Sequence, residues 1–205
     1  MKCLLQIVTE YIDNFAEENN IQRLAAIIGG EAVIMHGIPR TTIDLDILFY
    51  YKQETNYYDN LCKRLASFLR EKFIEDFEIT HFEASKDPFD PLRHDLIVIK
   101  DKQNRFRKLD ILIANYKWEL EGLLSMGSAH SCPITAYPKP YLVAMKLMAG
   151  GLQDEEDIKN LFFIMTDSEK EKAYALAKQI KRDKNLNKIL SHKRKHIQDD
   201  HLEEL

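Results

Sequence analysis

Apolar residues recur at helical spacing in two stretches of the first half of the chain. Residues 2–18 place leucine, isoleucine, valine and aromatic side chains three and four positions apart, and Asn19-Asn20 ends this pattern. Residues 57–73 carry a similar stripe. Because such spacing gathers the apolar side chains on one face of a helix, both stretches are predicted to be amphipathic helices packed on a core.

Shorter apolar runs predict β-strands, which we expect at residues 23–29, 44–51, 77–83, 94–100 and 105–114. The polar residues 101–104 separate the last two runs, and this arrangement is typical of a β-hairpin. A short helix is expected at residues 31–36, because Gly37 supplies the glycine that commonly follows a helix.

Beyond Pro138 the pattern is helical only. Helices are expected at residues 141–149, 155–165, 169–180 and 186–192, with breaks at Gly150-Gly151 and Thr166-Asp167. The sequence therefore predicts an α+β fold with two domains. A small mixed-sheet domain flanked by helices would occupy residues 1–136, and a C-terminal helical bundle domain would occupy residues 137–205.

The composition indicates a globular protein with a substantial core. Of 205 residues, 45% are hydrophobic and 30% are charged. The formal net charge of -4 argues against a general nucleic-acid coat protein, so any RNA contact is expected on one face only. The strongest charge asymmetry is the basic run at residues 181–196, which holds Lys181, Arg182, Lys184, Lys188, Lys193, Arg194 and Lys195.

Cysteine usage and hydropathy predict a cytoplasmic protein without a membrane partner. Cys3, Cys62 and Cys132 show no C-x-x-C spacing, which favours reduced thiols over a disulfide framework or a zinc knuckle. No stretch approaches the roughly 20 apolar residues of a membrane span. Glu10 and Asp13 come too early for the apolar core of a signal peptide.

Two carboxylates share one predicted strand. Asp44 and Asp46 are two residues apart, so both are expected to point one way while Ile43 and Leu45 point the other. Two carboxylates in an apolar strand repel each other and lose hydration, which a cation between them would offset. Oxygen-only ligation suits Mg²⁺ or Mn²⁺, ions that hold nucleotide phosphates together with one or two protein carboxylates.

A third carboxylate is expected from the next apolar strands. Asp110 stands between Leu109 and Ile111, where an isolated charge is hard to accommodate. Asp95 is the alternative, but it lies near the start of its strand beside His94, where solvent or an ion pair can satisfy it. We favour Asp110. Three carboxylates can hold two divalent ions about 3.5–4 Å apart, and Asp110 is also a candidate general base.

The residues before this strand suggest a phosphate site. Gly29-Gly30 ends an apolar run and opens a short helix, as a phosphate-binding turn would. Glu31 argues against this assignment, because a carboxylate there competes for the same amides unless it turns outward. Arg40 and Thr41, just before the Asp pair and followed by Thr42, are candidates for orienting a triphosphate, and also suit a plain surface loop.

The helical region contributes three further candidates. Lys146 is the only charge in the apolar stretch between Pro140 and Gly151, so it either extends to solvent or meets an anion. Asp154 and Asp157 are also explained by a favourable interaction with the start of their helix. His36 is expected to be a packing or capping residue.

Together these motifs resemble the nucleotidyltransferase superfamily of polymerase-beta-like fold. The resemblance rests on Gly-Gly at 29–30, Arg-Thr at 40–41, Asp-x-Asp at 44–46 and the apolar-flanked Asp110. Within the superfamily the chain is most similar to the bacterial branch that contains the toxin of the AbiE abortive-infection system. The match covers the first domain well, and over the helical domain it rests on the single stretch AMKLMAGGLQDEEDI.

The resemblance implies roles for individual residues. Gly29 and Gly30 would bind triphosphate, and the helical domain would add a lysine and an aspartate to the cleft: Lys146 with Asp154 or Asp157. The metal ligands would be Asp44, Asp46 and Asp110. The chain departs from the family at Leu152-Gln153, where a basic residue usually precedes the first aspartate.

The expected function is metal-dependent transfer of a nucleoside monophosphate from a nucleoside triphosphate to an acceptor, with release of pyrophosphate. The AbiE resemblance makes a tRNA 3′ end the favoured acceptor, and it implies a toxin–antitoxin system with a cognate antitoxin as partner. Two alternatives remain open. One is transfer to a small molecule of the aminoglycoside type, and the other is a catalytically degenerate module that binds a nucleotide or a partner.

Overall fold

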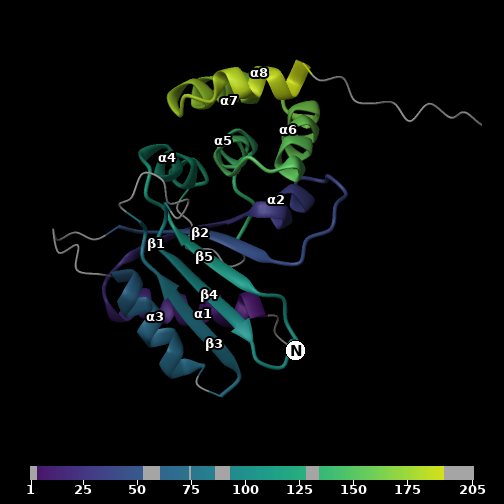
Figure 1. The fold of residues 1–205 in the computed structure, drawn as a ribbon. Coiled ribbons are helices and arrows are strands. Elements are labelled where there is room, and N and C mark those ends of the chain that lie inside the picture. Colours follow the sequence, from purple (N-terminus) through teal and green to yellow (C-terminus); the bar gives the residue numbers. More distant parts are fainter. Residues whose placement is uncertain (1–3, 53–60, 74, 86–92, 128–133, 192–205) are drawn as a thin grey trace, which may run out of the picture.

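The fold is built on a single mixed sheet, drawn in Figure 1. The computed structural model describes residues 4–52, 61–73, 75–85, 93–127 and 134–191. Its strands are β1 (Gln22–Ile28), β2 (Leu45–Lys52), β3 (Phe77–Phe82), β4 (Leu96–Asp101) and β5 (Leu109–Ile113). They lie side by side in the order β1-β2-β5-β4-β3. Only β2 and β5 run parallel, and the other neighbours are antiparallel.

One face of the sheet is covered by two amphipathic helices, α1 (Leu4–Glu18) and α3 (Leu61–Lys72). The ring of Phe15 in α1 contacts Tyr51 of β2 and Phe68 of α3, with centroids 6.2 and 5.4 Å apart. Side chains of β2 at odd positions therefore point into this core, where Ile47 and Phe49 are fully buried. Even positions of β2 face the opposite way.

The opposite face carries the short helix α2 (Gly29–Met35), then α4 (Lys117–Ser125) and α5 (Lys139–Ala149). The segment before α5 lies along β1, because Ile27 exchanges backbone hydrogen bonds of 2.9 and 2.8 Å with Thr135 and Tyr137. This segment places α5 over the sheet face to which Asp46 belongs.

The C-terminal helices pack on one another, as Figure 1 shows. They are α5, α6 (Leu152–Ile164), α7 (Asp167–Gln179) and α8 (Asp183–Ser191). Gly150 ends α5 in the left-handed conformation with φ of 77°, and Thr166 begins α7 with a capping box to Glu169. Among the described residues, no helix is long and apolar enough to cross a membrane.

The predicted α+β fold with a mixed sheet, flanking helices and C-terminal helices is confirmed. The boundary between residues 136 and 137 stays a prediction. Helix α4 escaped the sequence analysis because its buried face carries Glu119 and Gly122 while Leu124 is exposed, which leaves a weak amphipathic pattern. The expectation that Ile43 points to the core is wrong: β2 begins only at Leu45, and Ile43 is 83% exposed.

Candidate functional site

Strand register brings the predicted carboxylates together. The parallel pairing of β2 with β5 places Asp46 directly opposite Asp110. Asp44 lies one residue before β2 and reaches the same cluster, which we call the carboxylate cluster (Asp44, Asp46 and Asp110). Asp95 is on the other side of the sheet, where its Oδ1 accepts a hydrogen bond of 2.7 Å from the backbone N–H of Ala84. The structure therefore places Asp110, and not Asp95, beside Asp46.

A lysine that the sequence analysis missed lies within this cluster. The Nζ of Lys108 is 2.9 Å from Oδ2 of Asp110 and 3.3 Å from Oδ2 of Asp44. Burial lowers the pKa of Lys108, but the hydrogen bonds and charges of Asp110 and Asp44 outweigh it and leave this pKa above its usual value. The available signal was its position two residues before Asp110 in an extended chain, which puts both side chains on one face.

One ammonium does not neutralise three carboxylates. Burial, followed by the charges of Asp110 and Asp44, raises the pKa of Asp46 to about 6 although Lys108 and Lys146 oppose the shift. Among the described residues, Oδ1 of Asp110 is buried and has no hydrogen-bond partner. The cluster thus offers oxygen atoms that lack both charge compensation and partners.

Gly29 and Gly30 allow the chain to approach these carboxylates closely. Gly29 has φ of 63°, and a Cβ on it would lie 2.0 Å from Oδ2 of Asp46. A Cβ on Gly30 would lie 2.8 Å from Oγ1 of Thr42 and 2.9 Å from Cζ of Arg40. Side chains at these positions would therefore collide with the candidate site itself.

A polar cavity of about 370 Å³ opens on one side of the carboxylates. It joins the glycine turn, the loop before β2 and the start of α6. Its lining is Gly29, Gly30, Arg40, Thr41, Thr42, Ile43, Asp44, Asp46, Lys146, Gln153 and Asp154. Ile43 is exposed because it precedes β2 and forms part of the wall of this cavity instead of part of the strand.

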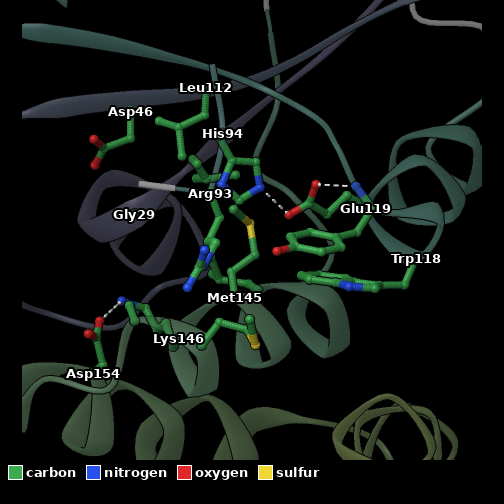
Figure 2. Close-up of a pocket in the computed structure, with 15 residues that line it drawn as sticks. Gly29, Asp46, Arg93, His94, Leu112, Trp118, Glu119, Met145, Lys146 and Asp154 are labelled. Atoms are coloured by element: carbon green, nitrogen blue, oxygen red, sulfur yellow. Dashed lines mark hydrogen bonds and ion pairs between the residues drawn. The ribbon is translucent and has the colours of Figure 1, made fainter. Parts of the chain in front are cut away.

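A second cavity, mostly apolar and about 280 Å³ in volume, lies between the sheet and helices α4 and α5 (Figure 2). Aromatic and thioether side chains form much of its wall, including Tyr116, Trp118, Met145 and Met148. The rings of Tyr116 and Trp118 are stacked with centroids 6.1 Å apart. Both cavities share Gly29, Asp46, Lys146 and Asp154, so Asp46 stands at their junction.

The apolar cavity also contains a polar pair that the sequence analysis did not anticipate. Nε2 of His94 is 2.8 Å from Oε1 of Glu119, whose side chain is 1% exposed. The other oxygen of Glu119 accepts backbone N–H groups of Asn115 and Tyr116 at 2.9 and 3.1 Å. These bonds fix the carboxylate at the start of α4, and the carboxylate in turn fixes the His94 ring in the cavity wall (Figure 2).

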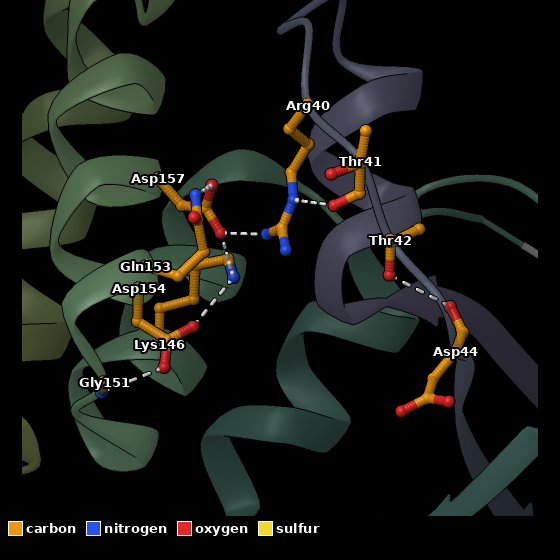
Figure 3. A network of polar contacts seen from close by, with 9 residues as sticks. All are labelled: Arg40, Thr41, Thr42, Asp44, Lys146, Gly151, Gln153, Asp154 and Asp157. Atoms are coloured by element: carbon orange, nitrogen blue, oxygen red, sulfur yellow. Dashed lines mark hydrogen bonds and ion pairs between the residues drawn. The ribbon is translucent and has the colours of Figure 1, made fainter.

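Lys146 belongs to a second charged group, the paired cluster, which consists of Lys146, Arg40, Asp154 and Asp157 (Figure 3). Nζ of Lys146 is 3.0 Å from Oδ1 of Asp154 and 2.6 Å from Oδ2 of Asp157. Arg40 also forms an ion pair with Asp157. Because Lys146 is 5% exposed, it meets anions rather than extending to solvent.

The remaining candidates divide by location. Asp154 lines both cavities, whereas Asp157 is 1% exposed and lines neither of these two. Glu31 turns away from the glycines and pairs with Arg107 at 2.8 Å, which removes the expected competition with phosphate. His36 has a packing role, because its Nε2 lies 2.8 Å from the backbone oxygen of Tyr137.

The carboxylate cluster fits a divalent cation such as Mg²⁺ or Mn²⁺. The donors are all oxygen atoms, one of them is buried without a partner, and burial together with the charges of Asp110 and Asp44 raises the pKa of Asp46. A bound cation would supply the missing positive charge. The polar cavity beside it presents the cations Arg40 and Lys146, as a site for a phosphate chain requires.

No protein-family model matches this chain, and no curated protein matches it. Solved structures similar to it include the antibiotic-resistance factor ANT(2'')-Ia, with 13% identity, a TM-score of 0.47, and coverage of 89% of this chain and 94% of that chain. An antigenic nucleotidyltransferase-like protein from Paracoccidioides brasiliensis has 17% identity and a TM-score of 0.43, with 91% of each chain covered.

Terminal uridylyl transferase 4 from Trypanosoma brucei with bound UPU shares 11% identity with this chain, with a TM-score of 0.42 and 78% of this chain covered. The chain spans about half of that protein, 51% of its length. Similarity at these levels assigns no role to any individual residue of this chain.

Proposed function

We propose that the protein is a metal-dependent nucleotidyltransferase, which transfers a nucleoside monophosphate from a nucleoside triphosphate to an acceptor and releases pyrophosphate. One observation carries the proposal. Asp44, Asp46 and Asp110 converge beside Gly29, with too little positive charge to balance them and an open polar cavity next to them.

Each part of the site has a role in this proposal. Asp44, Asp46 and Asp110 would hold Mg²⁺ or Mn²⁺, and the polar cavity would accept the triphosphate against the glycine turn, Arg40 and Thr41. When bound, the ions neutralise charge that develops on the transferred phosphoryl group and its leaving group. Lys146 and Asp154, at the junction of the cavities, position the nucleotide from the helical side.

Bond making at the α-phosphorus requires an acceptor hydroxyl to lose its proton. The acceptor oxygen forms a bond to the α-phosphorus, and the bond from that phosphorus to the bridging oxygen of pyrophosphate breaks. We assign Asp110 as the general base that accepts this proton, because its Oδ1 is buried and has no other partner among the described residues. The apolar cavity, with Tyr116 and Trp118, suits the planar base or another apolar part of a substrate.

The AbiE resemblance favours a tRNA 3′ end as the acceptor. It also implies that the protein acts as a toxin and has a cognate antitoxin. Lys181, Arg182 and Lys184 are exposed at the start of α8 and offer positive charge to a phosphate backbone. Lys193, Arg194 and Lys195, which the sequence analysis included in this surface, lie outside the described residues. A small acceptor of the aminoglycoside type is the alternative acceptor class.

Lys108 favours a second function, that of a catalytically degenerate binding module. Its ammonium group already lies between Asp44 and Asp110, where a divalent ion is expected. In such a protein the lysine would replace the ion, and a nucleotide or a partner would bind without turnover. In the enzyme, by contrast, Lys108 would move off the carboxylates so that Asp44 and Asp110 could hold the ions.

A transfer assay distinguishes these functions. The full chain is incubated with Mg²⁺, each α-labelled nucleoside triphosphate in turn, and either total tRNA or a panel of aminoglycosides. Label in the tRNA or in one aminoglycoside, absent with the matched variant Asp46→Asn, supports the transferase and identifies its acceptor class. Nucleotide binding that is independent of Mg²⁺, without transfer to any acceptor, supports the binding module instead.

A further inference from the structure

A second group of ligand-type side chains lies on the sheet face opposite the carboxylate cluster. Cys62 comes from the first turn of α3, His81 from β3, and Asp95 from the residue before β4. One ligand atom of each lies within 4.8 Å of the others, and this is the one such group of three among the described residues. A thiol, an imidazole and a carboxylate have thus converged from three elements.

Strand register shows that this group is separate from the proposed catalytic site. His81 pairs with Ile97, Ile97 pairs with Ile111, and Ile111 pairs with Ile47. Residues paired across strands share a face, and Ile47 points into the core under α1 and α3. Asp46 and Asp110 are each one residue away from this row and so face the other way.

Buried polar atoms at this group lack partners. Among the described residues, Nε2 of His81 and the hydroxyl of Tyr51 are buried and accept or donate no hydrogen bond. Leaving a buried polar group unpaired is costly, so natural proteins rarely leave one without a reason. An imidazole nitrogen without a hydrogen-bond partner, beside a thiol and a carboxylate, is available to coordinate a metal ion.

The surroundings of the thiol are acidic. Burial, followed by the charges of Asp95 and Glu83, raises the pKa of Cys62 to about 12. Cys62 is 4% exposed, and no lysine or arginine is among the causes that shift its pKa. A cation at this point would offset the negative potential that Asp95 and Glu83 create.

We propose that Cys62, His81 and Asp95 bind one transition-metal ion, for which Zn²⁺ has the best-matched chemistry. Sulfur and nitrogen ligands disfavour Mg²⁺ and Ca²⁺, whereas Zn²⁺ accepts thiolate, imidazole and carboxylate in tetrahedral sites. The ion displaces the thiol proton to solvent and forms a bond to the thiolate sulfur, and water or Glu83 takes the fourth position.

The spacing of the three ligand atoms suits a metal ion, because they all lie within 4.8 Å of one another. Bond lengths of about 2.0–2.3 Å to Zn²⁺ put tetrahedral ligand atoms about 3.3–3.8 Å apart, so each pair of ligand atoms has to approach by at most about 1–1.5 Å. The bound ion ties α3 to the edge formed by β3 and β4, which makes it a structural ion for that half of the core.

Cobalt substitution tests the site directly. The full chain, stripped with a chelator and kept reduced, is titrated with Co²⁺ and then with Zn²⁺. We expect one equivalent of Co²⁺ to produce the near-ultraviolet thiolate-to-cobalt charge-transfer band, and Zn²⁺ to abolish that band by displacement. Zn²⁺ should also raise the melting temperature of the wild type. Absence of the band in the wild type overturns the proposal without reference to any variant.

Variants assign the band to these residues. Cys62→Ser should lose it, and His81→Asn should weaken Co²⁺ affinity at least tenfold. The matched control is Cys3→Ser with Cys132→Ser, which removes the other two thiols and should retain the band. Asp46→Asn should retain it too, because the carboxylate cluster is on the other face. A band that survives Cys62→Ser, or disappears with Cys3 and Cys132, contradicts the assignment.

Discussion

Two charged clusters flank the same glycine turn and differ in their balance of charge. In the paired cluster, Asp154 and Asp157 meet two cations, Lys146 and Arg40. In the carboxylate cluster, three carboxylates meet one ammonium, that of Lys108. Among the described residues, only the second cluster contains a buried carboxylate oxygen without a partner.

The difference indicates a structural role for Asp157 and is consistent with the functional role proposed for the carboxylate cluster. Asp157 accepts bonds from Arg40 and Lys146, and it joins the loop before β2 to α5 and α6. Such a hub holds the helices in place over the sheet. In the carboxylate cluster Lys108 pairs with Asp44 and Asp110, but burial, followed by the charges of Asp110 and Asp44, raises the pKa of Asp46 to about 6. Its geometry makes sense as a cation site.

The largest expected effect is on catalysis. Asp46→Asn removes a metal ligand at the junction of both cavities, so nucleotide transfer should fall below detection. The free energy of unfolding should stay the same or rise, because the change relieves like-charge repulsion in the metal-free protein. Transfer assays and urea denaturation measure the two effects. A variant that fails to fold would make Asp46 structural and would erase the contrast between the clusters.

The paired cluster should respond in the opposite way. Asp157→Ala leaves Lys146 and Arg40 without their shared, fully buried partner, and breaking a buried ion pair in this manner costs about 3–5 kcal/mol of unfolding free energy. Asp154→Ala should cost less, because Asp154 is more exposed and Lys146 keeps Asp157. Urea denaturation of both variants checks the order. Equal costs would contradict the role of Asp157 as the hub.

Much of the fold was predictable because periodic burial reflects local sequence. The β-hairpin and the helices other than α4 follow from the spacing of apolar residues, and the apolar neighbours of Asp110 favour it over Asp95 as the third carboxylate. The carboxylates themselves were predictable from the sequence, because a charged residue within an apolar strand is unusual. Their roles stay predictions until the variants are measured.

The rest of the site depends on contacts between distant residues. Nothing in the sequence pairs His94 with Glu119 or Arg40 with Asp157, which are 25 and 117 positions apart. The sequence analysis did not single out Lys108, because the predicted strand at residues 105–114 includes it. In the structure Lys108 comes directly before β5. The resemblance offers Asp154 or Asp157 for the cleft, and the burial of Asp157 between Lys146 and Arg40 is a property of the packed helices.

Lys108 provides a sharper test of the carboxylate cluster. In Lys108→Met the ammonium no longer competes with a divalent ion for Asp44 and Asp110, so Mn²⁺ affinity in the absence of nucleotide should rise severalfold. Titration of Mn²⁺ with detection of the free ion measures this affinity. Arg107→Met, which removes a nearby cation that pairs with Glu31 instead, is the matched control and should change it little. A loss of Mn²⁺ affinity in Lys108→Met would contradict competition.

The raised pKa of Asp46 predicts a defined pH dependence of stability without divalent ions. The native state binds the Asp46 proton more tightly than the unfolded state, so this carboxyl group contributes stability below about pH 4. That contribution is lost as the pH rises from the unfolded value of 3.8 to about 6. The free energy of unfolding of Asp46→Asn minus that of the wild type should therefore increase over this interval and stay constant above it. A difference in unfolding free energy that does not change with pH would contradict the raised pKa of Asp46.

The smallest effect is expected far from both clusters. Arg182→Ala with Lys184→Ala should weaken tRNA binding about uniformly across sequences and reduce its salt dependence by roughly one unit of slope for each lost phosphate contact. Nucleotide binding should not change. The control, Lys63→Ala with Lys100→Ala, removes the same charge from exposed positions on α3 and β4. Equal effects of the two pairs, or none, would shift the acceptor toward a small molecule.

The central claim is that the carboxylate cluster binds divalent ions together with a nucleoside triphosphate. The most direct measurement is the melting temperature of the wild type and of Asp46→Asn, with Mg²⁺, with a nonhydrolysable nucleoside triphosphate, and with both. We predict that both together raise the melting temperature of the wild type well beyond either alone, and raise that of Asp46→Asn much less. An equal rise in the two proteins would place the metal and nucleotide elsewhere and contradict the account.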